Sequence, residues 1–116
     1  MIDEPTLDAD GYPSEETLEV IKNWKYNDDT KFVDLLEYVN KVWHWTDYMQ
    51  MREIQNRLGI DVYEYTCVTG GWSGNEELIS ALEQNFMFWA LCWRESHRGG
   101  RHVFEIKKAS PTHDLP

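Results

Sequence analysis

The chain has 116 residues, 21 of them acidic and 11 basic, so its formal net charge is −10 at pH 7. This length is typical of one domain, and 41% apolar residues suffice for a hydrophobic core, which argues against global disorder. A strongly acidic chain repels phosphate backbones, which disfavours general nucleic-acid binding. The longest apolar run, 86–93, is far shorter than the roughly 20 residues that cross a bilayer, and the acidic start 1–4 is not typical of a signal peptide. We therefore expect a cytoplasmic protein with no membrane partner.

Two helices are predicted in the first half of the chain. Residues 1–13 combine acids, prolines and Gly11 without periodicity, which predicts a flexible acidic lead-in to a single domain over 14–108, with a frayed tail over 109–116. Ser14 is the expected N-cap of the first helix, and 27–29 (Asn-Asp-Asp) the cap of the second. The inward stripe of the first helix is expected at Leu18, Ile21 and Trp24 or Lys25. Six apolar residues at helical spacing define the second: Phe32, Leu35, Leu36, Val39, Val42 and Trp43. Glu37 and Lys41 are expected to pair on its outer face.

A hairpin is expected next. Residues 61–69 alternate and are rich in β-branched and aromatic side chains, which predicts a strand with Tyr63, Tyr65 and Cys67 on one face. Residues 48–54 fit either a partner strand across 55–59 or a continued helix, and we favour the hairpin. Ser73 and Glu76 form a capping-box pattern before a third helix over 75–84.

The last third of the chain leaves one element ambiguous. The run 86–93 is apolar at every position, which fits a helix that is apolar on all sides or a strand covered on both faces; its aromatic content favours the strand. A turn over 96–100 then leads to a strand over 101–106 with Phe104 and Ile106 inward. The predicted fold class is α+β, with two N-terminal helices followed by ββαββ and a small, mainly antiparallel sheet covered by helices.

The glycine-rich run before the third helix is the main candidate site. Glycines allow close approach of a ligand, and a helix start favours negative charge. The candidate binding residues are Gly70, Gly71, Trp72, Ser73, Gly74, Asn75, Glu76 and Glu77, together with Arg98 and Arg101 from the last turn. A phosphate cradle is one reading, although the run lacks the spacing of a P-loop or dinucleotide motif. A tight strand-to-helix turn on which Trp72 packs is the other.

Two tryptophans fall outside the periodic faces. Trp45 and Trp72 are therefore the best candidates for exposed anchors of a protein interface, where Trp is enriched. Acidic neighbours of Trp72 are expected at Asp61, Glu76 and Glu77. A basic cluster near the end could bind phosphate or an acidic partner, but we expect it mainly to neutralise the acidic N-terminal half of the same fold or of a second copy. It comprises Arg94, Arg98, Arg101, Lys107 and Lys108.

Residue types suited to catalysis or metal binding are present without the matching spacing. Cys67, Cys92, His97 and His102 are zinc-ligand types, but neither cysteine belongs to a Cys-x-x-Cys knuckle. A Cys92–histidine pair lacks a group to orient the base. Ser73 stands in a sequence that departs from Gly-x-Ser-x-Gly at Asn75. We therefore predict no catalytic residues, no metal and no cofactor. One disulfide is possible in a secreted protein, but two buried free thiols fit a reducing cytosol better.

Residues 69–106 resemble small uncharacterised proteins encoded by tailed bacteriophages and prophages. The likeness lies in TGGWSGNE at 69–76, FW at 88–89, CW at 92–93, RGG at 98–100 and FEI at 104–106, about a third of the chain. The resemblance implies a phage gene product in a bacterial host cytoplasm and carries no active site with it.

Three functions are compatible with these features. The first is a non-catalytic phage-derived accessory protein that binds a host macromolecule through an acidic, Trp-bearing surface, of the kind that inhibits a host defence or a host enzyme. The second is a small-ligand or nucleotide-binding protein that uses the loop 70–75. The third is a homo-oligomeric structural component whose basic last strand meets an acidic face.

Overall fold

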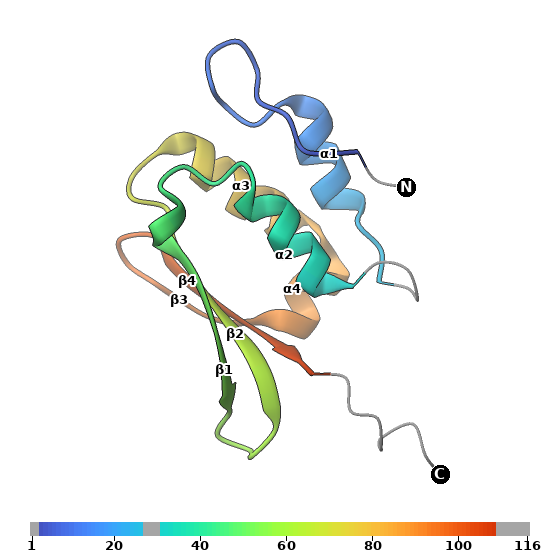
Figure 1. Ribbon diagram of the computed structural model, residues 1–116, viewed down its shortest axis with the longest axis vertical. Coiled ribbons are helices and arrows are strands. Elements are labelled where there is room, and N and C mark those ends of the chain that lie inside the picture. Colours follow the sequence, from blue (N-terminus) through green and yellow to red (C-terminus); the bar gives the residue numbers. More distant parts are fainter. Residues whose placement is uncertain (1–2, 27–30, 109–116) are drawn as a thin grey trace.

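The fold is α+β, with helices on one face of a four-stranded antiparallel sheet (Figure 1). The computed structural model describes residues 3–26 and 31–108. Their elements are, in chain order, α1 (Glu15–Asn23), α2 (Phe32–Asn40), a 3-10 turn η1 (Thr46–Tyr48), β1 (Met49–Gln55), β2 (Asp61–Val68), α3 (Ser73–Gln84), α4 (Phe86–Cys92), β3 (Trp93–His97) and β4 (Arg101–Lys107). The strand order in the sheet is β1-β2-β4-β3.

The hairpin favoured over residues 48–69 is confirmed. β1 pairs antiparallel with β2 from Met49 opposite Cys67 to Gln55 opposite Asp61. At its turn, the Asn56 side-chain oxygen accepts hydrogen bonds from the backbone N–H groups of Leu58 and Ile60. An asparagine that binds the backbone two residues ahead is typical of turns, so the register of the hairpin follows from local sequence.

The core lies between the helices and one face of the sheet. The strands contribute Tyr65, Cys67 and Phe104 to it, and α2 and α3 contribute leucines such as Leu35 and Leu78. Phe88 of α4 is fully buried, with its ring centroid 5.3 Å from that of Phe32 and 5.2 Å from that of Phe104. The alternation of β2 and the inward position of Phe104 and Ile106 are as the sequence predicts.

The strand predicted over 86–93 is wrong, because residues 86–92 form α4 and a strand begins only at Trp93. The Asn85 side-chain oxygen caps the helix by accepting from the Phe88 N–H, 3.1 Å away. The prediction assumed that an apolar run must be buried on all sides. Phe88 and Cys92 do enter the core, but Phe86, Met87 and Leu91 remain exposed. Among the described residues, no helix is both long enough and apolar enough to cross a membrane.

The ends of the first two helices agree with the sequence in part. Ser14 caps α1 as predicted, with its hydroxyl accepting from the Thr17 N–H. α2 ends at Asn40, so Val42 and Trp43 are buried in the connection that follows the helix. Lys41 pairs with Glu4 and not with Glu37 as expected, because it lies at the C-cap where the N-terminal segment passes. The caps predicted at 27–29 and the tail at 109–116 lie outside the described residues.

The segment before α1 folds back onto the domain. The Thr6 N–H donates to the Thr17 hydroxyl, and Leu7 forms an isolated bridge with Pro13. Tyr12 reaches the start of α3, where its hydroxyl lies 2.9 Å from that of Ser73. This contact brings the segment to the glycine-rich turn.

Candidate functional site

The glycine-rich turn between β2 and α3 lies beside the last turn of the chain. Gly70 and Gly71 adopt φ angles of +64° and +77°, a backbone conformation that residues with a side chain rarely adopt. The Thr69 N–H donates to the carbonyl oxygen of Gly100 over 3.0 Å, and a Cβ on Gly100 would collide with the Thr69 hydroxyl. The fold thus brings the turn that carries Arg98 and Arg101 next to the glycine-rich loop. Both arginines are exposed.

Asn75 is fully buried and links this turn to the chain that follows α2. Its side-chain oxygen accepts from the His44 N–H at 2.9 Å. Its side-chain nitrogen donates to the His44 carbonyl at 3.0 Å and to the Thr69 carbonyl at 3.2 Å. The amide therefore pairs three backbone groups that burial would otherwise leave without partners. In this position Asn75 holds two segments together, and its side chain has no polar atom left to point at solvent.

The capping box predicted for Ser73 and Glu76 is wrong. α3 begins at Ser73 itself, its N-cap is Trp72, and no side chain caps it. Ser73 is instead bonded to Tyr12. The helix starts two residues earlier than the pattern suggested, and Gly74 in its first turn is buried beneath the Trp72 ring, where a Cβ would collide with the indole. The prediction of a tight turn on which Trp72 packs is confirmed.

Five rings around this turn form a continuous aromatic cluster. Its members are Tyr12, Trp72, His44, Trp45 and Tyr48, in order of contact, with centroid distances of 5.2, 4.8, 4.3 and 5.6 Å between successive rings. Such spacings are typical of favourable ring pairs. Trp72 is half-buried, whereas Trp45 is 47% and Tyr48 46% exposed. Of the two tryptophans proposed as anchors, Trp45 is therefore the more accessible.

Trp45 has an unusual backbone. Its φ of +61° places a large residue in the left-handed region, the single non-glycine case among the described residues. A residue held there stores strain of order 1–3 kcal/mol, and such strain clusters at functional sites. The indole packs on Gly70, where a Cβ would lie only 2.7 Å from the Trp45 ring and 2.9 Å from that of Tyr48. The strained residue is thus held by the glycine-rich turn.

Substitutions at the two adjacent glycines separate these effects. We expect Gly71→Ala to lower the free energy of unfolding by about 1 kcal/mol through its positive φ alone, since a Cβ there meets nothing. Gly70→Ala adds a collision with two rings, so we expect roughly 2 kcal/mol more. Urea unfolding followed by circular dichroism measures both. Equal losses for the two variants would contradict a tight contact between Gly70 and the cluster.

Exposed carboxylates border the cluster. Asp47 lies between Trp45 and Tyr48 on η1, and Glu76 and Glu77 follow Asn75 on the first turns of α3. No hydrogen bond or ion pair is seen for these three carboxylates within the described part of the chain. Sequence reasoning missed Tyr12, His44, Tyr48 and Asp47. The one available signal was the aromatic run Trp43-His44-Trp45 directly after a helix. Sequence reasoning also wrongly placed Asp61 beside Trp72, because Asp61 begins β2 at the hairpin turn and Trp72 follows the other end of that strand.

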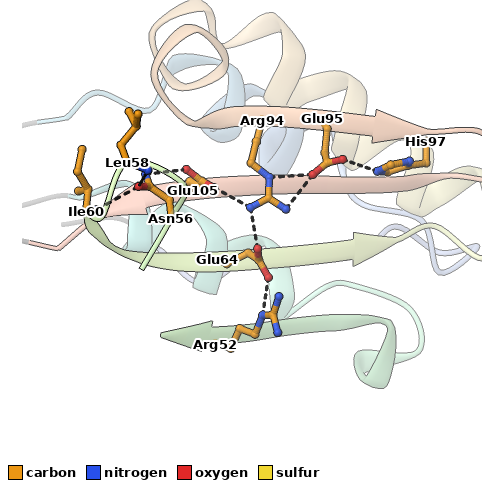
Figure 2. Close-up of polar contacts among 9 residues, drawn as sticks. All are labelled: Arg52, Asn56, Leu58, Ile60, Glu64, Arg94, Glu95, His97 and Glu105. Carbon is orange, nitrogen blue, oxygen red and sulfur yellow. Dashed lines mark hydrogen bonds and ion pairs between the residues drawn. The ribbon is translucent and has the colours of Figure 1, made fainter. Parts of the chain in front are cut away.

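A second polar arrangement crosses the face of the sheet opposite the helices (Figure 2). Glu64 of β2 is only 4% exposed and accepts from Arg52 of β1 at 2.6 Å and from Arg94 of β3 at 2.7 Å. Arg94 also binds Glu105 of β4 and its neighbour Glu95. A register shift between Trp93 and Glu95 marks a bulge, and this explains how two consecutive residues share one face.

The network joins two arginines to three carboxylates. Burial raises the pKa of Glu64, but the hydrogen bonds from Arg52 and Arg94 outweigh it and hold that pKa below the ordinary value of 4.5. The pKa of Arg94 is raised because its hydrogen bonds to three carboxylates outweigh its burial. A groove of about 470 Å³ between the hairpin turn and the network includes Arg94 and Glu105 in its lining. Because Arg94 is already fully engaged, the network is a structural cross-link of the four strands.

The thiols and histidines do not form a reactive site in the described part of the chain. Cys67 and Cys92 are free and buried as predicted, and burial raises the pKa of each thiol to about 12. At neutral pH both remain protonated and poorly nucleophilic. His97 pairs with Glu95, and no three His, Cys, Asp or Glu side chains among the described residues are placed to share a metal ion. Of the basic cluster, Lys108 pairs with Glu53 of the acidic N-terminal half as expected, whereas Arg94 binds carboxylates of the second half of the chain.

Comparisons with protein-family models, curated protein sequences and solved structures found no match for this chain. The likeness to phage proteins therefore stays a resemblance.

Proposed function

We propose that the protein is a non-catalytic binding protein that recognises a basic surface of a host macromolecule through the aromatic cluster and the carboxylates around it. The observation that carries the proposal is Trp45, a half-exposed indole on a left-handed backbone, packed against Gly70. Tryptophan is enriched among the few residues that dominate the free energy of binding at protein interfaces. A ring already held in place loses little conformational entropy when a partner binds.

Charge supports a basic protein as the partner. The chain carries a net charge of −10, and Asp47, Glu76 and Glu77 are exposed beside the rings. Such a surface attracts cationic side chains and accelerates encounter with a basic protein, whereas it repels nucleic acid. Aromatic faces add about 0.5–1 kcal/mol for each Lys or Arg cation that stacks on them at an exposed site. The resemblance to phage proteins leads us to look for this partner among bacterial host proteins, such as a defence factor or an enzyme that the protein would inhibit.

A capture experiment tests the proposal. Tagged wild-type protein is incubated with bacterial lysate, and bound proteins are identified by mass spectrometry. We expect one defined partner, captured at least tenfold less by Trp45→Ala, because loss of an interface anchor costs about 2 kcal/mol or more. Trp93→Ala is the matched control, since that indole is 42% exposed and lies on β3, outside the cluster. Equal capture by wild type and Trp45→Ala would show that the partner does not bind through the aromatic cluster.

A charge variant tests the class of partner. Glu76→Gln combined with Glu77→Gln keeps the shape of α3 and removes two exposed carboxylates. If the partner is basic, capture by this variant is weaker at low salt and approaches that of wild type as salt screens the charges. Stronger capture by the variant at low salt would instead indicate an acidic partner.

A small anionic ligand at loop 70–75 is the second candidate. The hydrogen bond between Thr69 and Gly100 favours it, because it sets the turn with Arg98 and Arg101 beside the loop. Against it, Gly74 and Asn75 are buried. A nucleotide at 100 times its Kd would add about 2.7 kcal/mol of stability. A thermal shift with nucleotides that Arg98→Met and Arg101→Met abolish would support this candidate over protein binding.

A further inference from the structure

α4 exposes an apolar face at the end of α3 remote from the aromatic cluster. Phe86 is 82% exposed, Leu91 66% and Met87 55%, and Tyr26, after α1, is 55% exposed. Large apolar side chains that gather on the surface of a charged protein mark an interaction site. α3 has 12 residues, about 18 Å of helix, between the cluster at its start and α4 after its end (Figure 1). The two surfaces are therefore distinct.

A groove lies beside α4, and its lining includes Asn85 and Met87, the two residues that flank the exposed Phe86. It has a volume of about 550 Å³ and runs between α4 and the end of α1 with the residues that follow it. Trp24, Tyr26, Met87 and Leu91 give it apolar walls, and Lys22 lies at its border. Asn85 and Asn23 also line the groove, but the side-chain nitrogen of Asn85 donates to the carbonyls of Ile21 and Trp24, and that of Asn23 donates to the Glu19 carbonyl. An aromatic ring fits such a space.

We propose that this face pairs with the same face of a second copy of the chain, with Phe86 of each copy in the groove of the other. A two-fold interface uses one patch twice, so the patch must contain both a projection and a matching recess. The α4 face contains both. It also carries both signs of charge, since Lys22 borders the groove and the exposed Glu83 precedes Phe86 by three residues. Lys22 of one copy thus meets an acidic end of α3 in the other.

The charges of this face distinguish its occupant from the partner of the aromatic cluster. Lys22 lines the groove together with Lys25 and lies 3.6 Å from the Glu19 carboxylate of its own helix, and the Lys31 ammonium lies 4.9 Å from the centre of the Tyr26 ring. A basic host protein is repelled by these lysines, whereas a second copy brings carboxylates. Pairing through α4 leaves both aromatic clusters free, so the dimer presents two of them. Two linked sites bind a partner with two or more copies of the target far more tightly than one site does.

The salt dependence of the dimer follows from its net charge. Two copies of charge −10 repel one another, and salt screens this repulsion. Salt also screens the Lys22–Glu83 contacts, but a two-fold interface has only two of these, and the apolar contact is unchanged. Raising the salt concentration therefore strengthens this dimer. An oligomer held by a basic last strand on an acidic face has the opposite dependence and weakens. Few large apolar side chains form the patch, so we expect a weak dimer with a dissociation constant in the micromolar range.

Analytical ultracentrifugation of the full chain tests the dimer. We expect the average mass of the 13.8-kDa chain to rise toward twice that value with concentration, and to rise more at ~500 mM than at ~50 mM salt. Phe86→Glu should weaken the dimer at least tenfold. Glutamate at the first position of a helix is favourable, and the Phe86 ring contributes little to the core, so the variant folds. The matched control is Leu58→Glu, because Leu58 is 81% exposed at the hairpin turn.

Each other outcome overturns the proposal. If the wild-type chain stays monomeric at high concentration and high salt, the α4 face does not bind a second copy and is left for a different protein. A dimer that Phe86→Glu leaves intact would lie on another surface. A dimer that salt weakens would be held by charge. Binding of the host partner to the aromatic cluster is measured with Trp45→Ala, so failure of the dimer and failure of the proposed function are separate results.

Discussion

Asn75→Ala is expected to lower the free energy of unfolding by about 3 kcal/mol. The substitution removes one fully buried amide and leaves the N–H and carbonyl of His44 and the carbonyl of Thr69 without their present partners. Each buried polar group that loses its partner costs about 1–3 kcal/mol, and water that enters the space recovers part of this cost. The loss appears as a lower urea midpoint with an unchanged slope, because the unfolded chain is the same.

Two further variants separate hydrogen bonding from size. Asn75→Asp keeps the shape and the bond from the His44 N–H but faces two carbonyl oxygens with a carboxylate, so we expect it to be at least as destabilising as alanine. Asn23→Ala is the matched control, because Asn23 is an exposed asparagine of α1. A loss below about 1 kcal/mol for Asn75→Ala would mean that the amide does not hold the two segments together.

Arg94→Met is expected to lower the free energy of unfolding by about 3 kcal/mol at pH 7. The substitution leaves Glu64, Glu95 and Glu105 near one another, with Arg52 still bonded to Glu64. Removing one partner of a buried ion pair costs about 3–5 kcal/mol, and the remaining Arg52 bond places this case at the lower end. Arg98→Met is the control, because Arg98 is an exposed residue of the β3–β4 turn, and surface substitutions typically stay within about 0.5 kcal/mol.

The same network predicts a pH dependence. The pKa of Glu64 is lower in the folded than in the unfolded chain, so its charged form contributes stability above the ordinary value of 4.5. That contribution disappears as the pH falls through the folded pKa. We therefore expect the difference in unfolding free energy between wild type and Glu64→Gln to be largest near neutral pH and to shrink below pH 4.5. A difference that grows on acidification would show that burial, and not the arginines, determines the protonation of Glu64.

Local patterns predicted most of the fold. The alternation of 61–68 and the periodicity of 32–39 each place one apolar face, and the two faces meet in the core. The run 86–93 was misassigned because its composition contains no polar face to reveal a helix. The Asn85 cap starts a helix there, and one apolar side of that helix is exposed. Sequence reasoning assumes that apolar residues face the core, so it could not predict this helix.

The candidate site was predicted in part. The glycine-rich turn and the turn of Arg98 and Arg101 were expected to meet, and the bond from Thr69 to Gly100 joins them. The role of Asn75 was not foreseeable, because its partners are backbone groups of residues far away in the sequence. The same holds for Tyr12, which reaches Trp72 from a segment without periodicity. Long-range contacts of this kind depend on how the helices stack, which local patterns do not encode.

The most direct test of a basic partner at the aromatic cluster is the dissociation constant of the captured host protein for wild type and Trp45→Ala. Isothermal calorimetry at ~50 mM and ~500 mM salt provides it for the purified pair. Our account predicts a weaker complex at high salt and at least a tenfold loss of affinity on Trp45→Ala at both concentrations. An affinity that neither salt nor the loss of that indole changes would contradict it.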